Sequence, residues 1–467
     1  MGDPRTRPLG AAGVLSRVGY GALFVVALPA LLVAVAVRAG VPAAVPRTPT
    51  VGVPVAVVGA LLLGLGVVGL VRRGGGLPMN AFPPPRLVTT GAFAVVGHPI
   101  YVGFCLGVAG VSLTVGSAGG LFVATPLAVV GALALVQGYE RLDLARRFGT
   151  LAAPLLGVGR LAPAARALGL DRAWRRVLDA AERLANSWSA RRIGPLRVIN
   201  HAVFSGLAGG VGAAIAVLAA GTASAGLVTG LMIAGAVGAA VVGQLLVGSS
   251  GGLSRPFGYF GGLAAIAVVG AVAWLVRPDA GVVLAAFCLA APWTQALGRL
   301  RCLVQGCCHG GPAPAASGIV VTNPHSRVCG QSPYCGLPIY PTQVYSIVGN
   351  LLLGPALLLA WQAGCTTTLI MGGYLVGAGA VRFVEEAYRG EPLTPVVGRL
   401  RLYQWFAVVM FVGGALLICA PGVPVPPLTW DAAPVALAVG LLFFAVCGAA
   451  LSVDAPESRR RFTRLSG

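Results

Sequence analysis

The chain has 467 residues, of which 57% are hydrophobic and 10% are charged, and its mean hydropathy is +0.86. Soluble domains usually carry about 25% charged residues, so the composition excludes a soluble enzyme and predicts an integral membrane protein. The formal net charge is +20, and all 33 basic residues are arginine. These arginines lie beside apolar spans rather than in a separate basic domain, which argues against a nucleic-acid partner.

Apolar runs predict an all-α membrane protein with about 12 transmembrane helices in two units, because roughly 20 apolar residues cross a bilayer. No clear cleavage site follows the first run, Ala22 to Val37, so we expect a retained helix rather than a signal peptide. The predicted helices begin near Gly21, Val51, Val102, Gly120, Ala202, Ala225, Phe257, Gly281, Tyr345, Thr367, Gln404 and Pro434.

Arginine placement predicts the orientation of these helices. Alternate loops hold nearly all of the flanking arginines, up to the tail Arg459–Arg461, whereas the opposite loops hold little beyond Arg47 and Arg277. Cytoplasmic loops are enriched in arginine. We therefore expect a multi-pass protein of the plasma (inner) membrane with both termini and the loop 298–344 in the cytoplasm.

The longest polar stretch divides the chain. Within it, apolar residues recur at helical spacing from Trp174 to Trp188, and the sequence leaves open whether this helix lies in the membrane interface or packs on its own domain. The predicted parts are 1–150, a four-helix membrane unit; 151–197, an arginine-rich amphipathic linker; 198–453, a second membrane unit; and 454–467, a basic cytoplasmic tail.

A polar motif opens one of the N-terminal spans. Thr89-Thr90-Gly91 leads into His98-Pro99-Ile100-Tyr101, and Glu140 follows the next predicted hairpin. A histidine and a tyrosine at a helix entrance, facing a carboxylate at a helix exit, could hold a ligand with hydroxyl and amine groups. Taken alone, His98-Pro99 is equally a helix start.

This order of residues resembles the isoprenylcysteine carboxyl methyltransferase family and its phospholipid methyltransferase relatives over about residues 83–149. The resemblance implies S-adenosylmethionine bound near Gly91, His98, Tyr101 and Glu140. Two positions depart from the pattern: Gly97 stands where the family usually has arginine, and Glu140 lacks the usual second glutamate. The alternative is a unit that kept only a structural role.

Four polar clusters mark the C-terminal unit. They are Gly248–Ser250 with Ser254–Gly262, then Gly298–Gly311, Tyr340–Tyr345 and Arg382–Arg389. Arg382 lies at the edge of an apolar helix, where a charge is costly and usually functional. Because guanidinium binds phosphate through parallel hydrogen bonds, Arg299 and Arg382 could clamp one phosphodiester; the alternative for Arg382 is a salt bridge to Glu385 or Glu386.

These clusters, in this order, resemble the prolipoprotein diacylglyceryl transferase family over about residues 198–419. The resemblance implies transfer of a diacylglyceryl group from phosphatidylglycerol to a thiol of a lipoprotein precursor, without a cofactor. It further implies that Arg299 and Arg382 hold the phosphate. The surrounding substrate site would comprise Arg301, Gln343, Tyr345, Gly261 and Gly262.

Several family positions differ here. Phe260 and Tyr340 stand where the family has histidines, and Cys302 and Cys307 stand where it has asparagine and glutamate. A thiol acceptor needs a base to become a thiolate, and His309 is the only histidine inside the signature. We therefore assign His309, with Arg299 and Arg382, to catalysis.

Five of the 10 cysteines lie in one loop, at Cys302, Cys307, Cys308, Cys329 and Cys335. The sequence leaves three possibilities open: zinc binding, disulfides, or free thiols. We assign no metal ligands from it.

The leading hypothesis is a membrane transferase acting on a phospholipid-type substrate. In the family the signature loop faces outward, whereas the arginine rule places it in the cytoplasm, which would favour a lipid acceptor over an exported lipoprotein. The alternatives are an S-adenosylmethionine-dependent methyltransferase of an isoprenoid or lipid, acting through the N-terminal unit, and a non-catalytic lipid-binding or transport protein.

Overall fold

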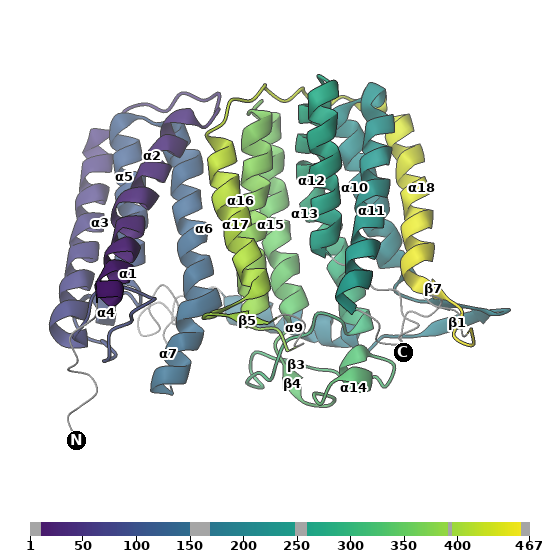
Figure 1. Ribbon diagram of the computed structural model, residues 1–467, viewed down its shortest axis with the longest axis horizontal. Coiled ribbons are helices and arrows are strands. Elements are labelled where there is room, and N and C mark those ends of the chain that lie inside the picture. Colours follow the sequence, from purple (N-terminus) through teal and green to yellow (C-terminus); the bar gives the residue numbers. More distant parts are fainter. Residues whose placement is uncertain (1–10, 150–168, 248–258, 391–394, 459–467) are drawn as a thin grey trace. The chain divides into compact units, whose positions relative to one another are not determined.

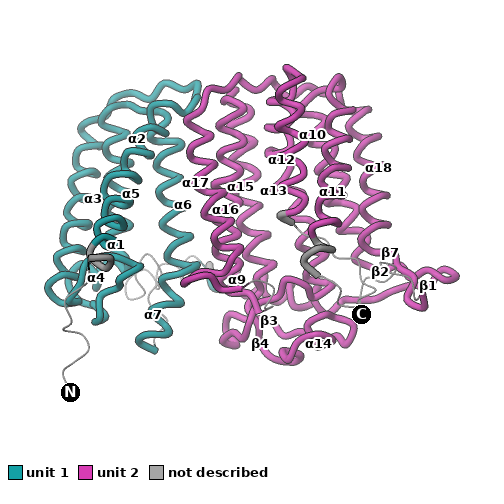
Figure 2. Tube along the Cα trace, viewed as in Figure 1, with its two compact units in different colours: residues 1–171 teal, residues 172–467 magenta. Residues whose placement is uncertain are grey.

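The computed structural model describes residues 11–149, 169–247, 259–390 and 395–458. It forms two compact units, 1–171 and 172–467 (Figure 2), called here the N-terminal and C-terminal units. The prediction of a helical membrane protein is confirmed. The predicted cluster at 248–258 and the tail arginines Arg459–Arg461 lie outside the described residues.

The N-terminal unit is built from helices joined in part by π-helical turns (Figure 1). Its elements are α1 (Ala11–Ala22), a turn at Leu23–Ala27, α2 (Leu28–Arg38), α3 (Pro49–Gly69), a turn at Leu70–Gly74, α4 (Ala92–Val95), α5 (Pro99–Val115), a turn at Gly120–Ala124, α6 (Thr125–Leu135), a turn at Val136–Glu140 and α7 (Arg141–Phe148).

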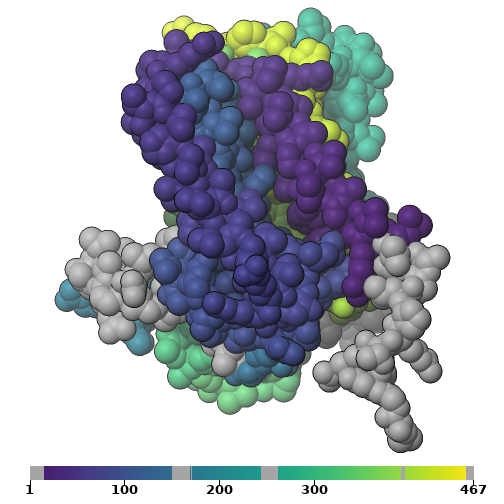
Figure 3. Space-filling view, turned by 90° about the vertical axis from the view of Figure 1, so that its left-hand side faces the viewer, coloured from purple at the N-terminus to yellow at the C-terminus, as the bar shows by residue number. Residues whose placement is uncertain are grey.

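Helices α3 and α5 approach closely because glycines face each other. A Cβ on Gly59 would lie 2.6 Å from the carbonyl oxygen of Gly103, and one on Gly103 would lie 2.5 Å from that of Gly59. Small residues let helices pack closely in lipid, where no hydrophobic force drives them together. The outward residues are large and apolar, among them Val57, Leu61 and Leu65, as suits a lipid-facing surface; Figure 3 views this unit from its side.

The C-terminal unit contains more helices and three small antiparallel sheets (Figure 1). Its elements are α9 (Leu170–Ala185), β1 (Ala190–Ile193), β2 (Leu196–Ile199), α10 (Ala202–Ala220), α11 (Ala225–Val247), α12 (Tyr259–Val276), α13 (Ala280–Gln305), β3 (Ile319–Val320), α14 (Arg327–Gln331), β4 (Pro338–Ile339), α15 (Thr342–Gln362), α16 (Thr367–Ala387), β5 (Val396–Val397), β6 (Leu400–Arg401), α17 (Leu402–Ile418), α18 (Ala433–Ser452) and β7 (Val453–Asp454), with short 3-10 turns at Thr222–Ser224 and Trp430–Ala432.

Among the described residues, nine helices are long and apolar enough to cross a membrane. Three shorter apolar helices, Pro99–Val115, Gly261–Val276 and Leu402–Ile418, correspond to the other predicted spans. Each predicted start therefore has a helix, whereas the predicted count of about 12 spans is met only if the shorter helices also cross.

The central core of the C-terminal unit surrounds α16, the most buried of the nine candidate spans. Ile370 and Tyr374 of α16 pack with Leu289 of α13 and with Leu357 and Trp361 of α15. The polar end of α16 therefore begins directly where a well-packed core stops, so its side chains are held in place.

Helix α9 packs on the C-terminal unit, which begins at Arg172. Leu178, Ala181 and Ala185 are buried against a cluster that includes Leu303 and Ile339. The apolar face of α9 thus packs within this unit. The sequence had left open whether it faces a membrane interface or packs on a domain.

Within the C-terminal unit, the small sheets, α9 and α14 lie at one end of the helices (Figure 1). Strands β1, β2 and β7 form one sheet, in which Arg197 pairs with Asp454. The Arg197 Nη2 atom lies 2.7 Å from the buried Asp454 carboxylate, so the end of the last helix is tied to the start of the unit.

Candidate active site

The last turns of α16 carry a buried cluster of opposite charges. Arg382 Nη1 lies 3.1 Å from Glu385 Oε1, and Arg382 Nη2 lies 3.0 Å from Glu386 Oε2. Arg389 contacts the same two carboxylates, at 3.7 Å each. Residues three and four apart share one face of a helix, so this part of the cluster follows from local geometry.

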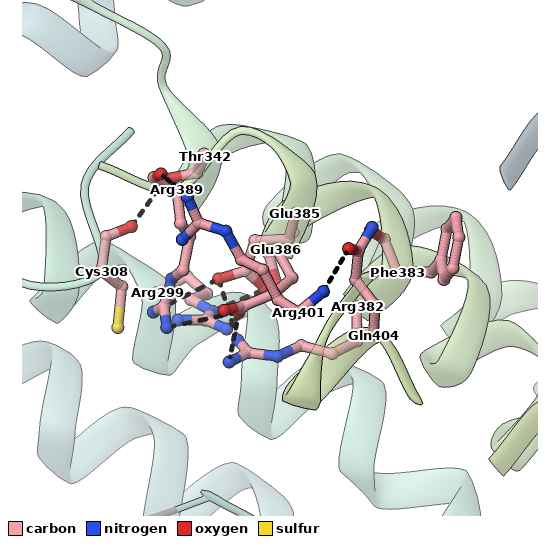
Figure 4. Close-up of polar contacts among 11 residues, drawn as sticks. Arg299, Cys308, Thr342, Arg382, Phe383, Glu385, Glu386, Arg389, Arg401 and Gln404 are labelled. Carbon is pink, nitrogen blue, oxygen red and sulfur yellow. Dashed lines mark hydrogen bonds and ion pairs between the residues drawn. The ribbon is translucent and has the colours of Figure 1, made fainter. Parts of the chain in front are cut away.

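Arg299 joins this cluster from another helix (Figure 4). Its Nη2 lies 2.8 Å from Glu385 Oε2, and its Nε donates to the Ser346 hydroxyl at 3.1 Å. The sequence-predicted pair Arg299 and Arg382 is thus brought together through Glu385. The salt-bridge alternative for Arg382 is present, because Arg382 pairs with Glu385 and Glu386, and the phosphodiester clamp stays a prediction.

The cluster contains three guanidinium groups and two carboxylates, so its formal charge is +1 when all five groups are ionised. The two glutamate side chains are 1% exposed. Arg389 Nε is buried, and no hydrogen-bond acceptor for it is found among the described residues. A buried site with one excess positive charge and an available donor suits an anion.

Helix α17 and the strand β6 before it also contact the last turns of α16; Figure 4 shows Arg401 and Gln404 beside the cluster. The Arg382 guanidinium lies over the Tyr403 ring, 5.2 Å from its centroid, and Gln404 donates to the carbonyl oxygen of Phe383 at 3.3 Å. Arg401 Nη2 donates to the carbonyl oxygen of Arg389 at 3.1 Å. These contacts fix the direction in which the buried arginines point.

Three cysteines meet where α13 ends. The Sγ atoms of Cys302, Cys307 and Cys308 lie within 4.8 Å of one another, because the chain reverses at Gly306, whose φ is +74°. Cys308 has φ +59° and is the sole non-glycine residue with positive φ in the described chain. This conformation costs about 1–2 kcal/mol, and such strain is typical of functional positions.

Helix α15 holds the backbone of this turn. Thr342 donates to the carbonyl oxygen of Cys308 at 2.6 Å, and Gln343 donates to that of Cys307 at 2.8 Å. Hydrogen bonds from Cys302 and Cys307, followed by the positive charges of Arg389 and Arg299, lower the pKa of Cys308 well below its usual value. The predicted site residue Gln343 thus donates to the turn 302–308, called here the thiol turn, and its part in substrate binding stays a prediction.

The other loop cysteines form a disulfide, Cys329–Cys335. Different possibilities left open by the sequence therefore apply to different cysteines: one pair is oxidised, and Cys302, Cys307 and Cys308 are free thiols.

Tyr345 lies in an aromatic group beside the cluster. Its ring stacks on Trp174 of α9, with centroids 6.4 Å apart, and contacts the Tyr388 ring at 5.8 Å. Tyr388 also meets Tyr340 at 4.8 Å. Tyr388 directly precedes Arg389 of the charged cluster. Because Tyr345 contacts Tyr388, these aromatic rings form a wall beside that cluster.

His309 is buried in a segment that runs along this wall. Its Nδ1 lies 3.0 Å from the carbonyl oxygen of Gly310, and its ring meets that of Tyr334 at 5.8 Å. Its main-chain carbonyl accepts a hydrogen bond from Gly390 at 3.0 Å. A Cβ on Gly390 would clash with the Gly310 carbonyl oxygen, and one on Gly310 would clash with that of Tyr340, which explains why both positions of this contact are glycine.

Three other predicted site residues have structural neighbours. Arg301 donates to the carbonyl oxygen of Leu451 at 2.9 Å, at the end of α18. A Cβ on Gly261 would lie 2.5 Å from the Gly238 carbonyl oxygen of α11, and one on Gly262 would lie 3.1 Å from that of Gly235. These glycines allow α12 to approach α11.

A histidine that the sequence analysis did not select lies near Arg301. His201 is fully buried; its Nδ1 lies 2.7 Å from the Ser452 hydroxyl and its Nε2 lies 2.6 Å from Gln305 Oε1. Burial, and then the charge of Arg301, lower the pKa of His201 to about 3. A neutral imidazole that donates to Gln305 and accepts from Ser452 satisfies this geometry, and it joins the ends of α10, α13 and α18.

The N-terminal unit brings together three of its four predicted ligand residues. His98 Nδ1 lies 3.5 Å from Glu140 Oε2, and the His98 and Tyr101 rings are 6.0 Å apart. Asn80 donates to the Tyr101 hydroxyl at 2.8 Å. The fourth, Gly91, has φ +67°, and a Cβ there would lie 3.1 Å from Arg73 Nη1. Its neighbour is therefore an arginine of the turn Leu70–Gly74, which follows α3.

Comparisons with known proteins agree with this division. Residues 243–420 match the family model described as prolipoprotein diacylglyceryl transferase, and residues 76–150 match that described as phospholipid methyltransferase. Both resemblances are confirmed. The transferase-like segment contains the charged cluster and the thiol turn, whereas the methyltransferase-like segment contains His98, Tyr101 and Glu140.

Curated relatives resemble the transferase-like part. A phosphatidylglycerol–prolipoprotein diacylglyceryl transferase 2 of Clostridium perfringens is 32% identical over 150 residues, covering 31% of this chain and 52% of the relative. A phosphatidylglycerol–prolipoprotein diacylglyceryl transferase of Clostridium tetani is 30% identical over 100 residues, covering 21% and 37%. The one from Dehalococcoides mccartyi is 41% identical over 59 residues, covering 13% and 21%. The chain spans about half the length of the first relative and less of the others.

Some site residues were missed by the sequence analysis although signals for them existed. Arg389 lies three and four residues after Glu386 and Glu385, the spacing that places it on their face. Ser346 lies on α15, directly after the selected cluster Tyr340–Tyr345. The link from Arg299 to Glu385 had no such signal, because 86 residues separate the two.

Proposed function

We propose that this protein is a membrane-bound transferase that moves the diacylglyceryl group of phosphatidylglycerol to a thiol acceptor. The single observation that carries the proposal is the buried cluster in which Arg299, Arg382 and Arg389 outnumber Glu385 and Glu386. Its excess positive charge suits the phosphate of a lipid headgroup. The names of the relatives supply the reaction class.

In this reaction the acceptor sulfur attacks the carbon of the diacylglyceryl group that bears the phosphate. A carbon–sulfur bond forms, the carbon–oxygen bond to phosphate breaks, and the electron pair leaves on the phosphate oxygen as glycerol 1-phosphate. Positive groups that already point at the place where charge develops lower the barrier without reorganising. Arg299, Arg382 and Arg389 have this role in the proposal, with Gln343 and Tyr345 shaping the site, and with Arg301, Gly261 and Gly262 supporting it.

His309 is proposed as the group that takes the acceptor proton. It is buried and lies in the segment bonded to Gly390, next to Arg389. Its Nδ1 lies near a carbonyl oxygen, so in the neutral form the proton sits on Nδ1, and Nε2 has the free electron pair.

We further propose a plasma (inner) membrane location with both termini cytoplasmic. The arginine distribution supports this orientation, and it would present the acceptor from the cytoplasm. The Cys329–Cys335 disulfide favours the opposite side, because disulfides persist in oxidising compartments. After mild reduction, labelling of Cys329 by an impermeant maleimide on intact cells would place the loop outside and make an exported lipoprotein precursor the acceptor; protection would support a cytoplasmic acceptor.

The activity has a direct test. Purified protein in detergent is given phosphatidylglycerol labelled in its headgroup glycerol, together with a cysteine-containing lipobox peptide. The expected result is release of labelled glycerol phosphate and a lipidated peptide. Release that is absent with every thiol acceptor, while the protein still binds phosphatidylglycerol, would instead support a lipid-binding or transport protein.

A second function is favoured by the His98–Glu140 pair in the N-terminal unit. We propose that this unit binds S-adenosylmethionine and transfers its methyl group to an isoprenoid or lipid. Glu140 Oε2 is buried and faces His98 Nδ1 at 3.5 Å, so this carboxylate is placed to accept from ribose hydroxyls or an amine that binds beside His98. When ionised it also attracts a positive sulfonium, the group that supplies the methyl.

This binding can be measured without knowing the methyl acceptor. Titration calorimetry should detect S-adenosylmethionine binding to the wild type, and Glu140→Ala should weaken it. An affinity unchanged by Glu140→Ala would remove this site, while the phosphatidylglycerol assay would be unaffected, so the two proposals fail separately.

A further inference from the structure

The three thiols at the end of α13 have the spacing of a metal site. Tetrahedral zinc holds thiolates at about 2.3 Å, which places their sulfurs roughly 3.8 Å apart, and the Sγ atoms of Cys302, Cys307 and Cys308 all lie within 4.8 Å of one another. Small side-chain rotations would suffice to close this triangle. The group contains no histidine or carboxylate among the described residues, so three ligands are available.

Side chains of α15 hold the backbone that carries two of these thiols. Thr342 and Gln343 donate to the carbonyls of Cys308 and Cys307, and Cys308 adopts a left-handed conformation at φ +59°. Only glycine adopts this conformation without cost, so the cysteine must be kept there by the rest of the turn. The strained backbone of Cys308 thus places a third sulfur near those of Cys302 and Cys307.

Charge also favours a metal here. Three thiolates around Zn²⁺ carry a net charge of about −1, and Arg299 and Arg389 both interact electrostatically with Cys308. The cationic cluster described above thus borders the thiol group. A phosphate held by those arginines would lie next to a metal held by these cysteines.

We propose that Cys302, Cys307 and Cys308 bind one zinc ion whose fourth position takes the sulfur of the acceptor thiol. This inference rests on the proposed diacylglyceryl transfer and names the device that activates its acceptor. Zinc sites with three protein ligands keep an open position for water or substrate. Soft thiolates also bind copper(I), but a trigonal copper(I) site would be complete with three ligands and would leave no such position.

The step balances without a redox partner. The acceptor thiol loses its proton, to His309 or water, as its sulfur binds zinc; the zinc-bound thiolate then forms the bond to the glycerol carbon, and the phosphate oxygen leaves with the electron pair. Zinc keeps its oxidation state throughout. The thioether product is a weak, uncharged ligand, so water displaces it and the site is restored.

The first test is metal content. The full-length protein, purified in detergent under reducing conditions without chelator, should contain about one zinc per chain by mass spectrometry of metals. Cys302→Ser and Cys308→Ser should each reduce this at least tenfold, whereas Cys419→Ser, which alters the cysteine at the C-terminal end of α17, should leave it unchanged. If Cys308→Ser aggregates, Cys302→Ser decides the matter, because it leaves the left-handed turn intact.

The second test reports on the open position. Cobalt(II) exchanged into the site should show sulfur-to-cobalt charge-transfer absorption, and addition of a cysteine-containing lipobox peptide should change the visible spectrum, whereas its serine analogue should not. A protein without stoichiometric zinc, with copper instead, or with a disulfide between two of the three cysteines would overturn the inference. A cobalt spectrum that the cysteine peptide leaves unchanged would overturn the role of the fourth position.

The zinc site and the diacylglyceryl transfer can be refuted separately. Glycerol phosphate release that continues in metal-free protein refutes the zinc inference and keeps the proposed transfer. Stoichiometric zinc that responds to the peptide, in a protein that never releases glycerol phosphate, keeps the metal site and refutes the transfer.

Discussion

The two units of this chain hold polar clusters of opposite character. In the N-terminal unit, Glu140 faces His98 and lies near Tyr101, and when Glu140 is ionised and His98 is neutral the group has one negative charge. In the C-terminal unit, three arginines surround Glu385 and Glu386, and the group has one positive charge.

The opposite charges of the two clusters suit different ligands. A buried group with an excess of one sign is stable only when a partner of the other sign arrives or when the group is neutralised. The N-terminal cluster therefore suits a cation such as a sulfonium, and the C-terminal cluster suits an anion such as a phosphate. The clusters also differ in their partners, because the C-terminal carboxylates face guanidinium groups whereas Glu140 faces one imidazole.

The largest expected effect is on the C-terminal cluster. Glu385→Gln removes the carboxylate that Arg299, Arg382 and Arg389 share, and leaves buried cations without their partner. Such a loss costs about 3–5 kcal/mol, and thermal unfolding in detergent should show it as a markedly lower midpoint. The control is Glu457→Gln, because Glu457 pairs with Arg192 while both side chains are exposed, at 78% and 67%, and exposed pairs contribute about 0–1 kcal/mol. Equal shifts in the two variants would mean that the cluster is not held by its charges.

Arg299→Gln should have the next largest effect, on catalysis. It keeps a hydrogen-bonding side chain but removes the charge beside the leaving phosphate, so glycerol phosphate release should fall about a hundredfold. Arg277→Gln, at the other end of the unit and paired on the surface with Asp279, should leave the rate unchanged. A rate in Arg299→Gln within about twofold of the wild type would assign the phosphate to another site.

Acid should act on the C-terminal unit through His201. Its folded pKa of about 3 lies below the unfolded value of 6.5, so this contribution is fully present above about pH 6.5 and is lost as pH falls towards 3. At about pH 5, about 2 kcal/mol of this contribution to the free energy of unfolding has been lost. Unfolding midpoints measured between these pH values should fall, and His201→Gln, which cannot be protonated there, should flatten the slope. A slope as steep in this variant would point to another group.

The smallest expected effect is Glu140→Gln in the N-terminal unit. Because Glu140 faces one histidine rather than several arginines, its neutralisation should change stability by no more than about 1 kcal/mol. Affinity for S-adenosylmethionine should nevertheless fall, by about tenfold, since a charge-assisted hydrogen bond is lost. A stability loss as large as that of Glu385→Gln would erase the contrast between the two clusters.

Much of the fold could be predicted from local sequence. Every predicted helix start has a helix in the structure, because the length and apolarity of a span depend on consecutive residues alone. The pairing of Arg382 with Glu385 and Glu386 was foreseen as an alternative for the same reason: it follows from helical spacing. The short sheets were not predicted, since their strands are two to four residues long and carry no periodic signal.

Local sequence features predict a helical membrane protein of two parts, one resembling a methyltransferase and the other a diacylglyceryl transferase, and they select Arg299 and Arg382 as one candidate phosphate site. The contacts between distant segments come from the folded chain alone: Glu385 links Arg299 to Arg382, three of the five loop cysteines converge, and His201 connects three helix ends. The physical reason is that apolar spans and helical faces are local properties, whereas charges and thiols meet through packing of helices that lie far apart along the chain.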